Sequence, residues 1–267
     1  MTGRAPLPSL TGVVITRDEE DRIARCVESM VGLCRDVLVL DSGSTDATVA
    51  VARAAGARVE HQDWLGFSAQ KNAAIARAQT PWVLLLDADE WLAPGGVVAI
   101  RALFEQGRAE AADVWRLPRQ TLFLGRKLRF GGRRSEPIER LFRQDLRHAA
   151  VDVHEWLEHR GRRVAALDAP ILHDTARSVA HYRAKLDGYA RLQAQRKFGE
   201  GRRAGRATGY LHAAFYVAKD YVVRGGFLDG AAGWHYHRCQ ARYVLDKYRY
   251  LARLGRARTV QPPKRRP

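Results

Sequence analysis

A chain of 267 residues that is 46% hydrophobic can bury a sizeable core, which excludes a disordered polymer and favours one large α/β domain with an appendage. Its three cysteines are odd in number and share no metal-ligand spacing, which argues against a disulfide framework or a zinc site and favours a reducing, cytoplasmic setting. The formal net charge of +16 favours an anionic partner, and the arginines concentrate after about residue 101. The first ten residues have no long apolar core, and no apolar run reaches the roughly 18 residues of a membrane span, so we expect neither a signal peptide nor a transmembrane helix.

Three short apolar runs alternate with helical patterns in the first hundred residues. Strands are predicted over residues 12–15, 37–40 and 83–86, because continuous apolar runs are typical of strands that are covered on both faces of a parallel sheet. Helices are predicted over residues 19–33, 46–55 and 67–78. This β-α-β-α alternation predicts a doubly wound, mostly parallel sheet, whose ligands bind beyond the carboxyl ends of the strands.

After residue 113 the segments become shorter and more basic. Strands are predicted over residues 114–118, 139–143 and 164–172, and helices from about residue 179 onward. We therefore divide the chain into two halves of one domain (1–110 and 111–178), a basic helical region (179–258) and a disordered tail (259–267). In the helical region, one stripe either packs onto the main domain or forms an interfacial amphipathic helix; it consists of Tyr243, Leu245, Tyr248 and Leu251.

Polar residues follow the first two predicted strands. Thr16, Asp18 and Glu20 lie in an elbow that can present them to a nucleotide, although acids that cap a helix start explain the elbow more simply. Asp41 ends the second strand, where it is placed to accept a hydrogen bond from a base or ribose, and the small Gly43 lets the backbone approach a ligand closely.

The third strand ends in Asp87 and Asp89. Two carboxylates so close together, with no basic residue beside them in the sequence, are unfavourable unless a cation compensates them. Mg²⁺ and Mn²⁺ take oxygen ligands and bind substrate phosphates, so the pattern predicts a divalent ion that bridges to a diphosphate. His173, at the end of a later strand, either completes this metal site or simply caps the strand.

In this order and spacing, the three motifs resemble those of the inverting glycosyltransferases of family 2, which have the GT-A fold. The likeness covers residues 12 to about 105 and includes Gln70-Lys71-Asn72. It implies a nucleotide-diphospho-sugar donor, a UDP-sugar above all, and an Mg²⁺ or Mn²⁺ cofactor. The residues that it assigns to the nucleoside are Thr16, Asp18, Glu20 and Asp41; those near the sugar diphosphate, ribose and metal are Lys71, Asp87, Asp89 and His173. Many members have Asn where this chain has Asp18.

Later segments look like the subgroup that includes bacterial lipopolysaccharide core β-glucosyltransferases. They are residues 151–155, which follow the predicted strand 139–143, then 171–174 and 226–230. The resemblance implies transfer of glucose or another hexose to a saccharide or lipid-linked, phosphorylated acceptor during synthesis of cell-envelope polysaccharide or lipopolysaccharide core.

A single in-line displacement requires a base for the acceptor hydroxyl. We expect Glu155 to be that base, because a carboxylate in a polar turn beyond the first half of the domain could reach the acceptor; Asp152 is the second choice and His154 the third. A plain surface acid is the alternative.

Two other functions share part of this pattern. A nucleotidyltransferase that makes nucleotide sugars would have a similar acidic site, but it usually carries a glycine-rich triphosphate loop, which residues 16–20 lack. A nucleic-acid-binding protein would explain the charge alone, but the acidic strand ends would repel phosphates, so no nucleic acid is expected. For the basic C-terminal half we expect peripheral attachment to the inner face of the cytoplasmic membrane, and a merely soluble basic surface is the alternative.

Overall fold

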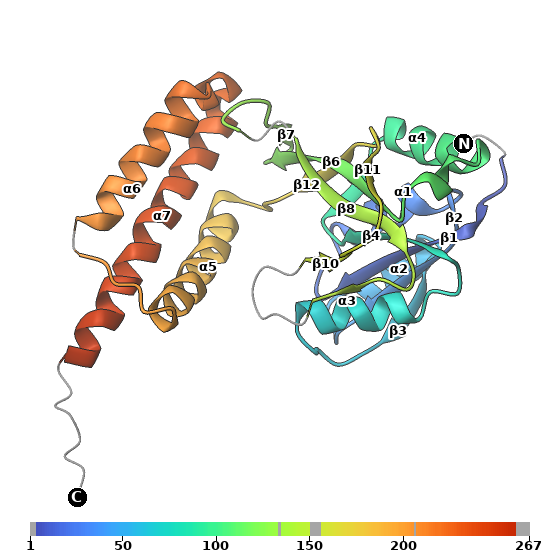
Figure 1. The fold of residues 1–267 in the computed structure, drawn as a ribbon, viewed down its shortest axis with the longest axis horizontal. Coiled ribbons are helices and arrows are strands. Elements are labelled where there is room, and N and C mark those ends of the chain that lie inside the picture. Colours follow the sequence, from blue (N-terminus) through green and yellow to red (C-terminus); the bar gives the residue numbers. More distant parts are fainter. Residues whose placement is uncertain (1–3, 133–134, 150–155, 206, 260–267) are drawn as a thin grey trace, which may run out of the picture. The chain divides into compact units, whose positions relative to one another are not determined.

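The computed structural model describes residues 4–132, 135–149, 156–205 and 207–259 (Figure 1). The chain forms two compact units. The first consists of residues 1–120 and 135–173, and the second of residues 121–134 and 174–267. The first unit contains most of the sheet, and the second is mainly helical.

A block of four parallel strands forms the beginning of the first unit. The strands are β1 (Leu7–Thr16), β2 (Cys34–Asp41), β3 (Arg58–His61) and β4 (Trp82–Asp87), in the spatial order β3-β2-β1-β4. The helices that connect them are α1 (Ile23–Met30), α2 (Thr48–Ala54) and α3 (Phe67–Ala76). This order is that of a doubly wound nucleotide-binding sheet.

Strands β1, β2 and β4 are apolar throughout their central parts because helices cover both faces of the sheet. In β1, Val14 belongs to the core under α1, whereas Val13 and Ile15 belong to the core under α3. Successive side chains of a strand point to opposite faces, so a strand buried on both sides needs an unbroken apolar run. Ile23 of α1 and Ile75 of α3 are fully buried on the two sides.

The sheet then continues with strands that are mostly antiparallel. The remaining elements of this part of the chain are β5 (Glu90–Leu92), α4 (Pro94–Glu105), the 3₁₀ turn η1 (Arg108–Ala111), β6 (Val114–Phe123), β7 (Arg126–Lys127), β8 (Glu136–Arg143), β9 (Arg147–His148), β10 (Leu157–Glu158), β11 (Val164–Ala166) and β12 (Ile171–Asp174). The path from β4 runs β4-β8-β6-β12-β5, with β8 antiparallel to both β4 and β6, and β12 antiparallel to β5. The predicted α/β sheet of the GT-A type, with a helical C-terminal region, is confirmed.

The second unit is built around three helices. They are α5 (Val179–Gly199), α6 (Thr208–Tyr216), which continues as the π-helical segment η2 (Val217–Val223), and α7 (Gly230–Thr259), which follows the 3₁₀ turn η3 (Gly226–Asp229). Phe123, Tyr182 and Tyr236 form an aromatic core, with ring centroids 5.2 to 5.7 Å apart. No helix in the described ranges combines the length and the apolar character needed to cross a bilayer.

Candidate functional site

The carboxyl ends of three neighbouring strands meet in register at one edge of the sheet. Thr16 at the end of β1 lies opposite Asp41 at the end of β2, and Ile15 lies opposite Asp87 at the end of β4. The strand order and the register therefore bring the three predicted polar motifs together, at the edge where doubly wound sheets bind their ligands.

Asp41 is buried and shapes the turn that follows β2. The backbone N–H groups of Gly43 and Ser44 each donate to its Oδ2 at 3.0 Å, and the Ser44 hydroxyl donates to its Oδ1. Gly43 has a φ of 89°, a conformation that glycine adopts without strain. The carboxylate is therefore held rigidly at the end of the strand.

Asp18 and Glu20 connect the elbow after β1 to the turn after β2. The Thr45 N–H donates to Asp18 Oδ1 at 2.8 Å, and the Ala47 N–H donates to Glu20 Oε2 at 2.9 Å. In return, the Asp18 N–H donates to the Ser44 hydroxyl at 2.9 Å. Asp18 itself has a φ of 51°, a left-handed conformation in which Asp and Asn are the favoured non-glycine residues.

Two cations from elsewhere in the fold contact Asp87. The Lys71 ammonium, on α3, lies 3.1 Å from Asp87 Oδ1, and the Arg140 guanidinium, on β8, contacts Oδ2. Desolvation raises the pKa of Asp87, but Arg140 and Lys71 outweigh it and hold the pKa well below its ordinary value. The expectation that no basic residue compensates this acid is therefore wrong, because its partners lie far away in the sequence but close in space.

Arg140 belongs to a buried ion-pair network that the sequence analysis missed. Its guanidinium lies 2.8 Å from the carboxylate of Glu90, which is fully buried, and Arg119 lies 3.2 Å from the same carboxylate. Desolvation lowers the pKa of Arg140, but Asp87 and Glu90 raise it above its ordinary value overall. The available sequence signal was an arginine placed directly before the apolar Leu141 and Phe142, inside a predicted strand.

Asp89 and His173 approach one another across the sheet. His173 Nε2 lies 3.3 Å from Asp89 Oδ2, because β12 pairs with β5 so that His173 lies opposite Glu90. Arg22 is 3.8 Å from the same carboxylate oxygen. Within the described residues, no group of three His, Cys, Asp or Glu side chains is spaced as a complete metal site. An oxygen and an imidazole nitrogen that face each other nevertheless fit an ion such as Mg²⁺ or Mn²⁺, which takes its other ligands from phosphate and water.

His148 of β9 is buried beside this charged cluster. Neither of its ring nitrogens has a hydrogen-bond partner among the described residues. Its backbone is held by Asn72, whose side chain accepts from the His148 N–H at 2.7 Å. Burial, followed by the charges of Lys71 and Arg140, lowers the pKa of His148 to about 3, so the ring is neutral near pH 7.

The predicted base Glu155, and the other candidates Asp152 and His154, lie outside the described residues. The structure does describe the residues that flank them in the sequence. His148 of β9 pairs with Leu157 of β10, and the Ala149 N–H donates to the Trp156 carbonyl at 2.9 Å. Both ends of the intervening segment therefore lie next to the buried His148.

Several known proteins are similar to this chain. It is 25% identical over 264 residues to the lipopolysaccharide core biosynthesis glycosyltransferase LpsC of Rhizobium meliloti, a match that covers 93% of this chain and 96% of LpsC. It is 40% identical over 113 residues to a TPR repeat-containing protein of Synechococcus elongatus, covering 42% of this chain and 28% of that protein. It is 42% identical over 83 residues to an uncharacterized glycosyltransferase of Rickettsia conorii, covering 31% and 29%. The chain thus spans less than a third of the length of these last two relatives.

Among solved structures, glucosyl-3-phosphoglycerate synthase from Mycobacterium tuberculosis, in complex with Mn²⁺, UDP and glucosyl-3-phosphoglycerate, has 24% identity and a TM-score of 0.34. The match covers 44% of this chain and 45% of that one. At the level of the family, the model described as "Glycosyl transferase family 2" matches residues 11–168, which hold the end of β1 and all of β2 and β4, together with the acids that follow them. This match covers more than half of the 267 residues, and the chain therefore belongs to glycosyl transferase family 2.

Proposed function

We propose that the protein is an inverting glycosyltransferase that moves glucose or another hexose from a nucleoside diphosphate sugar to an acceptor hydroxyl. The observation that carries this proposal is the register of β2, β1 and β4, which brings Asp41 and Asp87 to one edge of the sheet near the paired Asp89 and His173. A UDP-sugar is the donor that we propose first. The acceptor is a saccharide or a lipid-linked, phosphorylated saccharide of the cell envelope, a choice supported by the similarity to LpsC over 93% of the chain.

The nucleoside is held at the ends of β1 and β2. Asp41 and the backbone around Gly43 face the base and ribose, with Thr16, Asp18 and Glu20 beside them. Lys71 and Asp87 lie on the side of the sugar diphosphate. Because Lys71 and Arg140 keep Asp87 ionised, this carboxylate accepts hydrogen bonds from ribose or sugar hydroxyls without itself taking up a proton.

Asp89 and His173 would hold Mg²⁺ or Mn²⁺. The ion would supply positive charge that neutralises the departing nucleoside diphosphate. The protein's part is to hold one carboxylate oxygen and one imidazole nitrogen on the same side of the sheet edge, 3.3 Å apart. Arg22, close to Asp89, limits the rotation of that carboxylate.

In the transfer step, the acceptor oxygen forms a bond to the anomeric carbon while the bond from that carbon to the diphosphate oxygen breaks. One displacement inverts the configuration. The proton of the acceptor hydroxyl passes to Glu155, with Asp152 and then His154 as the alternatives. These residues belong to the segment between Ala149 and Trp156, both of which lie close to His148.

The test uses full-length protein, Mg²⁺ or Mn²⁺ and a panel of nucleotide sugars with UDP-glucose first. We expect one donor to raise the melting temperature in the presence of metal and to release its nucleoside diphosphate slowly. Asp89→Asn should lose both effects, whereas Asp168→Asn, which changes an exposed acid outside the cluster, should retain them. A folded protein that responds to no donor would contradict the proposal. Pyrophosphate release from a nucleoside triphosphate and a sugar phosphate would favour the nucleotidyltransferase alternative.

We also propose a cytoplasmic location. Cys26, Cys34 and Cys239 are free thiols, and all three are buried. Unpaired cysteines of this kind suit a reducing compartment. Labelling of the unfolded protein directly after cell lysis should find three reduced thiols, and a disulfide-linked form would contradict this location.

A further inference from the structure

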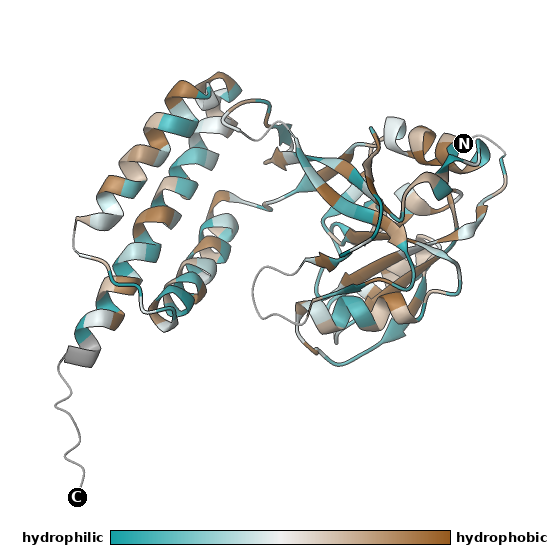
Figure 2. Cartoon of the chain, in the orientation of Figure 1, coloured by the Kyte–Doolittle hydropathy of each residue, from teal (hydrophilic) through white to brown (hydrophobic). Residues whose placement is uncertain are grey.

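The second unit exposes an apolar face along α6 and η2. Leu211 and Phe215, four residues apart on α6, are 70% and 65% exposed, and Val222 and Val223 of η2 are 56% and 82% exposed. Residues four apart lie on one side of an α-helix. Figure 2 shows several apolar (brown) segments along this helix. Of the twenty large apolar side chains that are exposed in the described part of the chain, nine lie between Tyr210 and Trp234.

The opposite side of the same helix is fixed against α7. A side chain at Gly209 would lie 3.0 Å from the Leu245 carbonyl, so α6 and α7 are in close backbone contact there. The Tyr216 hydroxyl is 2.8 Å from the ring of His237, and Asp220 is buried. The helix therefore cannot rotate to bury its apolar face without breaking these contacts.

The apolar face continues onto η3 and a neighbouring loop. Phe227 and Leu228 of η3 are 50% and 57% exposed. The Phe130 N–H donates to Asp229 at 3.0 Å, and the Gly131 N–H donates to the Arg224 carbonyl at 2.9 Å. These bonds place the partly exposed Phe130 ring next to η3. Two separate segments of the chain thus contribute to one end of the apolar face.

The surroundings of this face are basic. Between residues 207 and 234 the only acids are Asp220, which pairs with Arg224 at 2.6 Å, and Asp229, which accepts from the Arg129 and Phe130 N–H groups. Both carboxylates are thus used inside the unit, while Lys219 is exposed. The whole second unit has 26 basic and 6 acidic residues, a net charge of +20, whereas the first unit, with 19 basic and 23 acidic residues, has −4.

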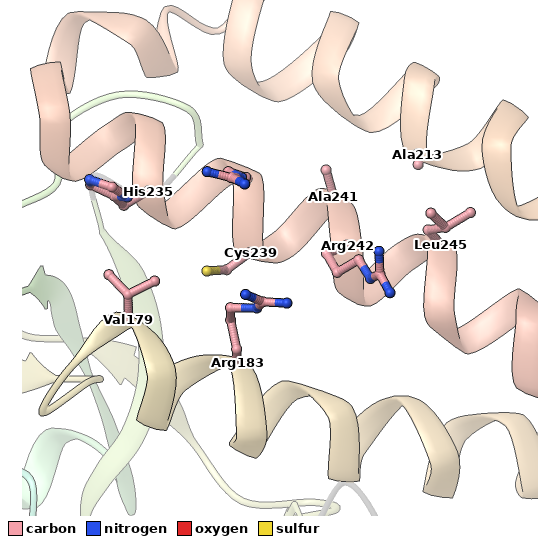
Figure 3. A pocket seen from close by; sticks show the side chains of 9 residues that line it. Val179, Arg183, Ala213, His235, Cys239, Ala241, Arg242 and Leu245 are labelled. Atoms are coloured by element: carbon pink, nitrogen blue, oxygen red, sulfur yellow. The ribbon is translucent and has the colours of Figure 1, made fainter.

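Arginines also line a groove between α5 and α7 in the same unit. The groove has a volume of about 350 Å³, and Figure 3 shows Arg183 and Arg242 beside Cys239 within it. Arg242 pairs with Asp246, but Arg183 and Arg238 have no acidic partner among the described residues. Guanidinium groups of this kind suit phosphate oxygens.

We propose that the face formed by α6, η2 and η3 binds an anionic lipid bilayer, with the apolar side chains entering the boundary between headgroups and acyl chains. An exposed apolar stripe on a strongly cationic unit is the combination that holds a helix in that boundary. Tyr210 and Trp234 place amphipathic rings at the level of the headgroups, as aromatic residues do at membrane surfaces. A second copy of the chain would bring two units of +20 together, and nucleic acid would leave the apolar stripe uncovered.

The experiment measures sedimentation of the full chain with vesicles of pure phosphatidylcholine and with vesicles that contain about 30% phosphatidylglycerol. We expect binding to the anionic vesicles and its loss when salt is raised from about 0.1 to about 0.5 M. The double variant Phe215→Gln/Val223→Gln should bind them at least about tenfold more weakly. Val98→Gln changes a side chain that is 68% exposed on α4 of the first unit, and it should bind as the unchanged protein does.

Thermal unfolding and donor-dependent release of nucleoside diphosphate are measured for each variant. The unchanged protein, the double variant and Val98→Gln should agree in both measurements, which separates a failure of membrane binding from a failure of the proposed transfer activity. Equal vesicle binding by the double variant, equal binding to neutral vesicles, or no binding to any vesicle would overturn the proposal. So would a dimer in the absence of lipid that the double variant abolishes, because the face would then belong to a second copy.

Discussion

The ammonium of Lys71 lies 3.1 Å from one oxygen of Asp87, while Arg140 contacts the other oxygen of the same carboxylate. The acid at the end of β4 is therefore held between two cations that come from α3 and β8. Since Lys71 is almost completely buried, water can replace it only poorly if it is removed.

Lys71→Met should therefore destabilise the protein and weaken donor binding. Arg140 remains as a partner of Asp87, so we expect a loss of about 2 kcal/mol in the free energy of unfolding rather than the larger cost of an uncompensated buried charge. The pKa of Asp87 should rise. Urea unfolding measures the loss of stability, and donor titration measures the loss of affinity. Arg108→Met, which removes an exposed cation from the same unit, should change neither.

Arg140→Met should lower the free energy of unfolding further, by about 3 to 5 kcal/mol, because it removes a cation from two acids at once. These acids are Asp87 and Glu90, of which Glu90 is fully buried. Adding Glu90→Leu to this variant should recover part of the loss, because it removes the acid that was left behind. A double-mutant cycle by urea unfolding gives the coupling between the two residues. Strict additivity would show that the 2.8 Å contact between them contributes nothing to stability.

His173→Ala and Asp89→Asn should each weaken Mn²⁺ binding in the presence of UDP by on the order of tenfold or more. His173→Ala removes the imidazole nitrogen of the 3.3 Å pair, and Asp89→Asn replaces its carboxylate by a neutral amide, which is a weaker ligand. Titration calorimetry, or the electron paramagnetic resonance signal of free Mn²⁺, measures the affinity. His212→Ala, a change to an exposed histidine of the second unit, is the matched control. Unaltered affinity in both site variants would remove these residues from the metal site.

His148 should make the stability of the protein depend on pH. Its folded pKa is lowered to about 3, whereas an unfolded histidine titrates near 6.5. Its contribution is therefore complete above about pH 6.5 and is lost as the pH falls from there toward 3, because the unfolded chain takes up a proton that the folded chain does not. The slope approaches about 1.4 kcal/mol per pH unit. Urea unfolding between pH 7 and 5 should show a smaller pH dependence in His148→Gln than in the unchanged protein.

Asp18→Asn should be nearly neutral for stability, and Asp18→Val should cost about 1 to 3 kcal/mol. Asn accepts the left-handed φ of 51° and retains an oxygen for the Thr45 N–H, whereas a β-branched side chain is strained in that conformation and offers no acceptor. Thermal unfolding of the two variants provides the comparison. Equal stability of Asp18→Asn and Asp18→Val would mean that the hydrogen bond between Asp18 and Thr45 does not contribute to the stability of the protein.

Local sequence patterns predicted the sheet and the positions of its acids because both depend on short segments. An apolar run that ends in a polar residue specifies a buried strand and its carboxyl end, and parallel strands bring such ends together. Asp41 and Asp87 could therefore be placed at one edge before any contact was known. The partners of Asp87 could not, since Lys71 and Arg140 reach it only through the packing of α3 and the antiparallel pairing of β8 with β4.

One helix boundary was predicted wrongly for a related reason. The helix expected from residue 19 begins at Ile23, because the Glu19 N–H donates to the Thr48 hydroxyl at 2.7 Å and the elbow is occupied by contacts to the next turn. The apolar stripe of the last helix, for which packing and an interfacial role were both open, includes a fully buried Leu251 and a partly buried Tyr243. The exposed apolar stripe lies on α6 instead, and contacts such as the packing of Gly209 against α7 show which side of α6 faces outward.

Asp18 and Glu20, which we propose contact the nucleoside, are already hydrogen-bonded to the turn after β2. A ribose or base that takes up the Asp18 carboxylate competes with the Thr45 N–H, and one that takes up Glu20 competes with the Ala47 N–H. Binding through these two acids is thus an exchange of hydrogen-bond partners with little net gain. Affinity for the donor must then come mainly from its other end, where the charges of the diphosphate are. The free nucleoside should be a far weaker ligand than its diphosphate.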